Sequence, residues 1–209
     1  MPLLASGSRR NCLLGAATVA SLLLTTPAAH AARAANPDNC VPTPTLVQPF
    51  AAWGDVADYT LTPGGDFEGA NSNWELDELA SIISGNEPFH VGAASDRSSL
   101  SLSAGSAAVS TPICVDETFT TFRLFARNTG NLASKLRVDV VYSNVKGRLA
   151  AKRGGAYKAT SAQWSPTGIM KIKVKFDATG AAPVAFRFTP DNHGTWQIDD
   201  VYVDPRLRH

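Results

Sequence analysis

The chain contains few of the residues from which catalytic and metal centres are usually built. Its 209 residues include 3 cysteines and 4 histidines. None of the histidines lies in a metal-ligand spacing such as H-E-x-x-H, and the sequence has no G-x-S-x-G elbow and no phosphate-binding glycine loop. These absences argue against the common hydrolases, metalloproteases and nucleotide-dependent enzymes, so we do not expect an enzyme.

A strong charge of one sign and a membrane-length apolar run are also missing. The apolar run from Leu13 to Leu24, which carries no charge, is shorter than the roughly 20 residues of a membrane-spanning helix. It follows Arg9 and Arg10 and precedes small residues around Ala29-His30-Ala31, which is the pattern of a secretory signal peptide. We therefore expect residues 1–34 to be removed from a secreted, extracellular or cell-surface protein, by either the twin-arginine or the general export route.

The processed chain would be close to neutral. Removal of residues 1–34 takes away three arginines and leaves 16 basic against 18 acidic residues. This balance gives no electrostatic reason to expect nucleic acid as a partner. No membrane span is expected in the mature chain.

Two cysteines, Cys40 and Cys114, remain after the predicted cleavage. In an oxidising compartment an isolated pair most often forms one disulfide, although two unpaired thiols remain the alternative. A bond between them closes a long loop, for which the chain-entropy model gives roughly 4 kcal/mol of stabilisation. We expect it to attach a proline-containing, extended lead-in (residues 35–55) to a single domain (residues 56–206).

Alternation of apolar and polar residues dominates that domain. Leu136, Val138, Val140 and Tyr142 alternate with polar residues, and the same period of two recurs at residues 99–103, 170–176 and 186–188. Such a period predicts antiparallel strands with one face in a core. Turn sequences separate the strands, and together they predict an all-β antiparallel sandwich or jelly roll. The turns lie at residues 128–131, 144–147, 154–155 (Gly154-Gly155), 165–168 and 191–194.

One segment leaves its secondary structure open. Residues 76–83 have some helical promise, but the segment is short and Gly85 and Pro88 end it. A strand or a single turn competes evenly with a helix there.

Acidic residues stand close to aromatic ones at both ends of the predicted domain. The first group is Gly65-Asp66-Phe67-Glu68-Gly69 followed by Trp74-Glu75-Leu76, and the second is Ile198-Asp199-Asp200-Val201. With Ser98-Ser99-Leu100-Ser101-Leu102 between them, these motifs resemble carbohydrate-binding modules of the jelly-roll, galactose-binding-like type. The resemblance spans most of the mature chain, and it implies that the first and last strands lie side by side.

The same resemblance implies a structural calcium ion between the terminal strands. Carried onto this chain, Glu68 and Asp200 match the ligand positions best, with Asp66 and Asp199 as neighbours that could substitute. The chemistry agrees, because Ca²⁺ accepts 6–8 oxygen ligands in flexible geometry. Carboxylates gathered without a cation would repel one another. The alternative is that these acidic residues are solvated strand ends.

Sugar binding by such modules relies on exposed aromatic rings beside hydrogen-bonding groups. Among the aromatic residues, Tyr157 and Trp164 are the expected ligand-binding pair, because they lie outside the clearest core alternation. Packing at a sheet edge is the alternative for both. An outward band of cations would either keep one sheet soluble or bind an anionic glycan. Its members are Arg123, Arg127, Arg137, Arg187, Lys171, Lys173 and Lys175.

The sequence therefore predicts a secreted, non-catalytic domain that binds carbohydrate or cell-envelope polysaccharide and holds a structural calcium ion. A cell-surface structural or interaction protein of the same fold, without a sugar site, is the alternative. The two differ in one observable, which is whether Tyr157 and Trp164 are exposed beside a groove.

Overall fold

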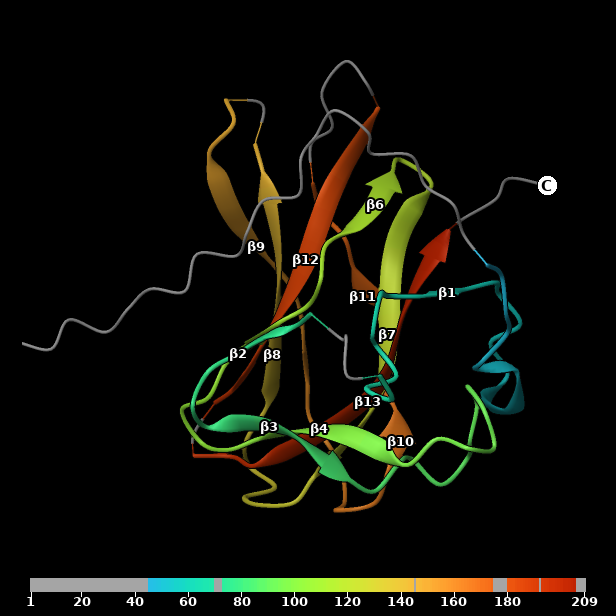
Figure 1. Cartoon of the computed structure of the whole chain (residues 1–209), viewed down its shortest axis with the longest axis vertical. Helices are drawn as coiled ribbons and strands as arrows, with labels where there is room; N and C mark the ends of the chain where they lie inside the picture. The colour runs from blue at the N-terminus through green and yellow to red at the C-terminus, as the bar shows by residue number, and fades with distance from the viewer. Residues whose placement is uncertain (1–44, 70–72, 145, 175–179, 192, 206–209) are drawn as a thin grey trace, which may run out of the picture. The chain divides into compact units, whose positions relative to one another are not determined.

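The computed structural model describes residues 45–69, 73–144, 146–174, 180–191 and 193–205. Within these ranges the chain forms two antiparallel β-sheets, one short 3-10 helix (η2, Ala51–Trp53) and no α-helix (Figure 1). The predicted all-β sandwich is therefore confirmed. The predicted signal peptide lies outside the described residues. Of the helices within these ranges, none is long and apolar enough to cross a membrane.

The first sheet has seven strands and is built around β7 and β13. Its order is β10-β7-β13-β4-β3, with β1 paired to β13 and β11 paired to β7. The strands are β1 (Thr60–Leu61), β3 (Ala80–Ser84), β4 (Ser98–Leu102), β7 (Phe119–Asn128), β10 (Ser165–Pro166), β11 (Met170–Lys171) and β13 (Trp196–Pro205).

The second sheet has six strands and is built around β12 and β8. Its order is β2-β5-β12-β8-β9, with β6 paired to β12. The strands are β2 (Glu75–Leu76), β5 (Ala108–Val109), β6 (Ile113–Asp116), β8 (Leu136–Ser143), β9 (Leu149–Tyr157) and β12 (Ala181–Pro190). Cys114 lies half-buried in β6, but Cys40 lies outside the described residues, so their pairing remains a prediction.

Alternating side chains from the two sheets meet in one core. Leu136, Val138 and Val140 of β8 are fully buried, as the alternation predicts. Across the sandwich, the ring of Phe122 in β7 lies 4.6 Å from that of Phe186 in β12. Burial of these apolar side chains is the main driving force for the fold.

The first and last strands of the domain are neighbours, as predicted. Thr60 pairs with Val203, and Leu61 pairs with Tyr202. β13 also pairs with β7 and β4, so it lies at the centre of the first sheet. The acidic residues of β13 are consequently flanked by other strands and lie inside the protein rather than at a solvated strand end.

The segment before β1 covers the outer face of the first sheet. Phe50 is fully buried, and its ring stacks on Phe125 at 5.2 Å. Arg123 is also buried on this face and forms an ion pair with Asp55 at 2.5 Å. The described part of the predicted lead-in, residues 45–55, is thus packed against the sandwich. Arg123 is correspondingly not part of an exposed cationic band.

Two local predictions are settled by strand pairing. The ambiguous segment 76–83 contains no helix. Leu76 ends β2, a turn follows, and residues 80–83 lie in β3. The predicted turn at Gly154-Gly155 is wrong, because both glycines lie inside β9. A Cβ at Gly154 would lie 2.9 Å from the Phe122 ring, and one at Gly155 would lie 2.5 Å from Met170. These glycines permit close packing between the sheets and a bulge in the β8–β9 register.

Gly194, two residues before the start of β13, gives a first test of this packing. A Cβ there would overlap the side chain of Ser134, whose Oγ accepts a hydrogen bond from Trp196 Nε1 at 3.0 Å. We expect Gly194→Ala to lower the free energy of unfolding by about 2 kcal/mol, because overpacking and loss of that hydrogen bond act together. Urea unfolding measures the change. Gly168→Ala is the control, since nothing lies within 4 Å of its Cβ position, and an equal loss in both variants would contradict the explanation.

Candidate functional site

An irregularity in β13 turns Asp200 into the protein. The register between β13 and β7 shifts between Asp199 and Tyr202, and Asp200 has a backbone φ of 50°. A bulge of this kind re-aims a side chain, and a non-glycine residue with positive φ is uncommon in a strand. As a result two consecutive aspartates, Asp199 and Asp200, are both buried.

The two carboxylates are held very differently. Asp199 Oδ1 accepts a hydrogen bond from the amide of Asp200 at 2.9 Å, and its Oδ2 accepts one from the amide of Glu87 at 3.1 Å. Both oxygens of Asp200 are buried and receive no hydrogen bond from any described residue. Buried polar atoms almost always have a partner, so an Asp200 carboxylate that is only 1% exposed requires an explanation.

The loop between β3 and β4, residues 85–97, supplies two more acidic side chains. Glu87 is fully buried, and its carboxylate accepts hydrogen bonds from the amides of Phe89 and Val91. Asp96 is also buried, and its Oδ2 accepts a hydrogen bond from the amide of Ala93 at 2.7 Å. These bonds fold the loop back on itself, so that it covers Asp199 and Asp200.

Asp96 and Asp200 converge beside Gly92. A Cβ built on Gly92 would lie 2.7 Å from Asp96 Oδ2 and 3.3 Å from Asp200 Oδ1. Two carboxylate oxygens from distant parts of the chain therefore face the same small volume. Gly92 allows this approach because it has no side chain.

Burial and mutual repulsion strongly perturb these carboxyl groups. Burial, followed by the charges of Glu87, Asp96 and Asp66, raises the pKa of Asp200 to about 8. Burial and the charge of Asp200 raise the pKa of Asp199 to about 9, although two backbone amides oppose the shift. In the absence of a cation, protons would therefore be retained on this cluster near neutral pH.

The arrangement suits an oxygen-seeking cation with mixed ligands. Asp200 and Asp96 face one another, and Glu87 and Asp66 add negative charge. Among the described residues no group of three or more Asp, Glu, His or Cys side chains is arranged to hold a metal by side chains alone. Ca²⁺ does not require one, because backbone carbonyls and waters commonly complete its 6–8 ligands.

Two of the four predicted metal residues, Asp199 and Asp200, lie in this cluster, and the charge of Asp66 acts on Asp200. Glu68 has different partners, since its Oε1 accepts hydrogen bonds from the amides of Arg97 at 2.6 Å and Ser98 at 2.5 Å. Glu68 thus fixes the start of β4 beside the cluster, and the assignment of all four as ligands remains a prediction.

Glu87 and Asp96 were not selected from the sequence. They lie in a loop between Gly85 and Arg97, where no periodic pattern indicates burial. The sequence shows only that Glu87 stands between Gly85 and Pro88, which are turn residues. Their burial follows from the position of the loop over β13, which sequence spacing does not give.

Tyr157 and Trp164 do not form an exposed pair. Trp164 is 9% exposed, and the Arg127 guanidinium lies 5.1 Å from its ring centre. Tyr157 is half-buried, its ring meets Trp196 edge-on at 5.8 Å, and its hydroxyl bonds to Ser165 Oγ at 2.7 Å. Both rings contribute to packing, and their role in ligand binding remains a prediction.

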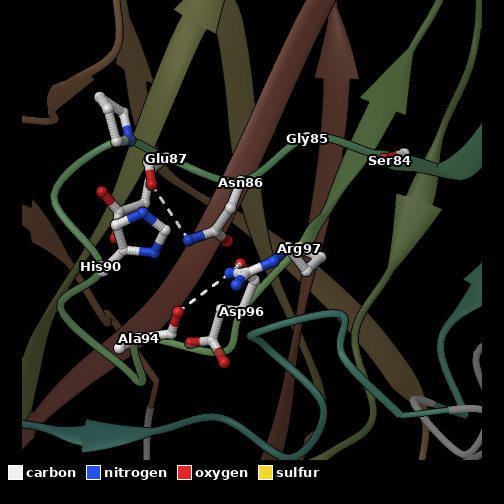
Figure 2. Close-up of a pocket in the computed structure, with 9 residues that line it drawn as sticks. Ser84, Gly85, Asn86, Glu87, His90, Ala94, Asp96 and Arg97 are labelled. Carbon is white, nitrogen blue, oxygen red and sulfur yellow. Dashed lines mark hydrogen bonds between the residues drawn. The ribbon is translucent and has the colours of Figure 1, made fainter.

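The β3–β4 loop also lines a solvent-open cavity of about 440 Å³. Figure 2 shows Glu87 and His90 along one side and Asp96 with Arg97 along the other, with Asn86 between them. Glu87 and Asp96 belong both to this wall and to the acidic cluster. The cavity and the cluster are therefore adjacent parts of one site.

Comparison with known proteins gives structural matches only. No protein-family model matches the chain, and no curated protein matches it in sequence. The CBM22-1 and GH10 modules of endo-1,4-β-D-xylanase 10B from Clostridium thermocellum, complexed with xylohexaose, match with a TM-score of 0.50 and 15% identity. That match covers 69% of this chain and 28% of the xylanase structure.

A second match covers a whole solved module. The CBM22-1 xylan-binding domain of Paenibacillus barcinonensis Xyn10C has a TM-score of 0.50 and 9% identity, over 81% of this chain and 99% of that one. At such low identity the likeness concerns the fold. The fold of this chain is that of the jelly-roll carbohydrate-binding modules.

Proposed function

We propose that this protein is a secreted, non-catalytic domain that binds carbohydrate or cell-envelope polysaccharide and holds a structural calcium ion. The observation that carries the proposal is the jelly-roll fold, shared with a xylan-binding domain over 81% of this chain. Xylan and related plant or envelope polysaccharides are consequently the first ligands to test. Nucleic acid is not an expected partner, since the processed chain is close to neutral.

The calcium part of the proposal is supported by the two unpartnered oxygens of Asp200. A buried carboxylate without hydrogen bonds, surrounded by other carboxylates, is unstable unless a cation or a proton neutralises the charge, and a cation allows it to stay ionised. Asp200 and Asp96 would supply two ligands, and carbonyl and water oxygens would supply the rest. Ca²⁺ fits such an irregular set better than Mg²⁺, which demands near-ideal octahedral geometry.

A disulfide between Cys40 and Cys114 belongs to the same proposal. Secretion places the chain in an oxidising compartment, where an isolated cysteine pair usually bonds. Cys114 lies in β6, opposite Pro183 of β12. Mass spectrometry of non-reduced peptides would identify the pair directly.

The carbohydrate-binding function is tested on a glycan array with the processed protein in calcium-containing buffer. We expect the protein to bind at least one class of polysaccharide on the array. The dissociation constants should lie in the micromolar to millimolar range. Isothermal titration with xylohexaose then checks the leading ligand class. If the folded protein binds no glycan more strongly than a heat-unfolded sample does, the carbohydrate-binding proposal is wrong.

The alternative is a cell-surface structural or interaction protein with this fold and no sugar site. The burial of Trp164 and the packing of Tyr157 favour it, because the expected stacking platform is closed. A negative array together with calcium-dependent stability would support this alternative.

A further inference from the structure

We propose that the cavity of the β3–β4 loop, with the aromatic pair Trp53 and Phe89 beside it, is the carbohydrate-binding subsite of this protein. The inference rests on the proposed function, and it assigns that function to a place where sequence analysis did not expect it. It also links glycan binding to the cation, because the same loop builds both parts of the site.

The cavity has the size and polarity of a site for a small sugar unit. Its volume of about 440 Å³ lies within the range of roughly 300–1,000 Å³ that small-ligand sites occupy. Asn86, His90 and Arg97 bring amide, imidazole and guanidinium groups to its wall (Figure 2). These are the hydrogen-bonding groups that can recognise sugar hydroxyls.

Arg97 and His90 keep unused hydrogen-bonding capacity. Arg97 Nη1 donates hydrogen bonds to the carbonyl oxygens of Ala94 at 2.9 Å and Asp96 at 2.6 Å, which fixes the guanidinium at the cavity. Within the described ranges, its Nε and Nη2 and the ring nitrogens of His90 have no hydrogen-bond partner in the protein. His90 also has a positive φ of 50°, a conformation that is uncommon outside glycine and that clusters at binding sites.

Two exposed aromatic rings stand next to this polar wall. Trp53 and Phe89 are 38% and 42% exposed, and among the described residues no other aromatic side chain is as exposed. Their rings meet edge-on at 4.8 Å, and both contact the buried ring of Phe125, at 5.3 and 5.6 Å. Aromatic faces stack on sugar rings, so this pair offers a stacking surface.

Chain connectivity joins the rings to the cavity. Phe89 lies between Pro88 and His90, and both of these line the cavity. The amides of Phe89 and Val91 are held by the carboxylate of Glu87. The position of the Phe89 ring therefore depends on Glu87, which is also one of the charges acting on Asp200.

This coupling makes glycan binding depend on the cation. A cation bound by Asp200 and Asp96 would relieve the repulsion around Glu87 and fix the loop in the conformation that forms the cavity. Loss of the cation frees the loop from this constraint, and a mobile loop must be ordered when the ligand binds, which lowers affinity. The same ligand would therefore bind more tightly with calcium than without it.

The test uses the full processed protein and the glycan that it retains best on the array. Trp53→Ala, Phe89→Ala and Arg97→Gln should each weaken binding about tenfold or more in isothermal titration. The calcium-induced rise in the unfolding midpoint should persist in all three, which shows that the variants fold and still bind the cation. Removing calcium from the unmodified protein should weaken glycan binding to a similar degree.

Ile169→Ala is the matched control, and Tyr157→Ala tests the competing location. Ile169 is an exposed apolar residue outside the cavity wall, so its removal should leave affinity unchanged. If Tyr157→Ala abolishes binding while the three cavity variants bind normally, the subsite lies elsewhere and this inference is overturned, although the proposed function stands. If the unmodified protein binds no glycan at all, both fail together.

Discussion

Calcium should raise the midpoint of thermal unfolding of this protein by roughly 10 °C, and removal of calcium should reverse the change. A ligand present at about 1,000 times its dissociation constant stabilises the folded state by about 4 kcal/mol. For a domain of this size, each kcal/mol shifts the midpoint by roughly 2–4 °C. The physical reason is the Asp200 carboxylate, which is buried without a hydrogen-bond partner among the described residues. Differential scanning calorimetry, with calcium and then with a chelator, measures the shift.

Asp200→Asn separates a specific site from a general salt effect. The amide cannot provide the charge that the cation needs, so the calcium-dependent shift should disappear. In calcium-free buffer the same variant should be more stable than the unmodified protein, because the folded protein no longer has to bury the Asp200 charge or keep a proton that the unfolded chain releases. Asparagine also tolerates the positive φ of this position well. These opposite effects in the two buffers are the signature of the site.

Glu117→Gln is the matched control for this experiment. It removes one negative charge from an exposed position between β6 and β7, so the calcium response should remain that of the unmodified protein. A midpoint that does not respond to calcium in the unmodified protein would count decisively against a structural cation. A response that survives in Asp200→Asn would place the cation elsewhere.

The sequence predicted the sandwich because its signal is local. Alternation at residues 136–142 depends only on neighbouring side chains, and each strand of a two-layer fold has one apolar face. The adjacency of the two chain ends also followed, since the acidic motifs stand in the first and last parts of the domain, and Thr60 pairs with Val203.

The composition of the site could not be predicted in the same way. The bulge that buries both Asp199 and Asp200 is a property of strand pairing, and regular alternation would place one of the two in solvent. Glu87 and Asp96 become part of the cluster only because their loop folds over β13.

The low exposure of Trp164 could not be predicted for a related reason. A position outside the core alternation predicts exposure, but Trp164 belongs to a buried cluster with Phe50 and Tyr59, and Arg127 lies over its ring. Trp53 lies in the segment that precedes β1 and is itself exposed. Exposure therefore depended on which segment covers the sheet, and sequence periodicity carries no information about that.

The pH dependence of the cation-free protein is the second large effect that we expect. Burial and mutual repulsion raise the pKa values of Asp199 and Asp200 far above those of the unfolded chain, to about 9 and 8. Between about pH 4 and these values the folded state keeps protons that the unfolded state has lost. Stability must then fall as the pH rises, by up to about 1.4 kcal/mol per pH unit for each such proton.

The free energy of unfolding without calcium should therefore be higher at pH 5 than at pH 8, by a difference on the order of 3 kcal/mol. This difference is smaller than two fully retained protons would produce, because local relaxation of the protein and entry of water reduce the cost of the buried charges. Asp55 does not obscure the result. Burial alone would raise the pKa of Asp55, but hydrogen bonds from Tyr59 and Arg123 outweigh burial and lower it. The contribution of Asp55 to stability is therefore lost only at more acidic pH.

Urea unfolding at constant ionic strength, from pH 5 to pH 8 and in buffers freed of divalent cations, measures this slope. Asp200→Asn should reduce it, because one of the two retained protons no longer exists. Saturating calcium should abolish it, since calcium binds the deprotonated carboxylates and the folded state then keeps no more protons than the unfolded chain. A cation-free stability that is flat or increases over this interval would mean that the carboxyl groups are not crowded in the way the structure shows. A single series of unfolding curves thus tests the geometry of the cluster independently of any glycan.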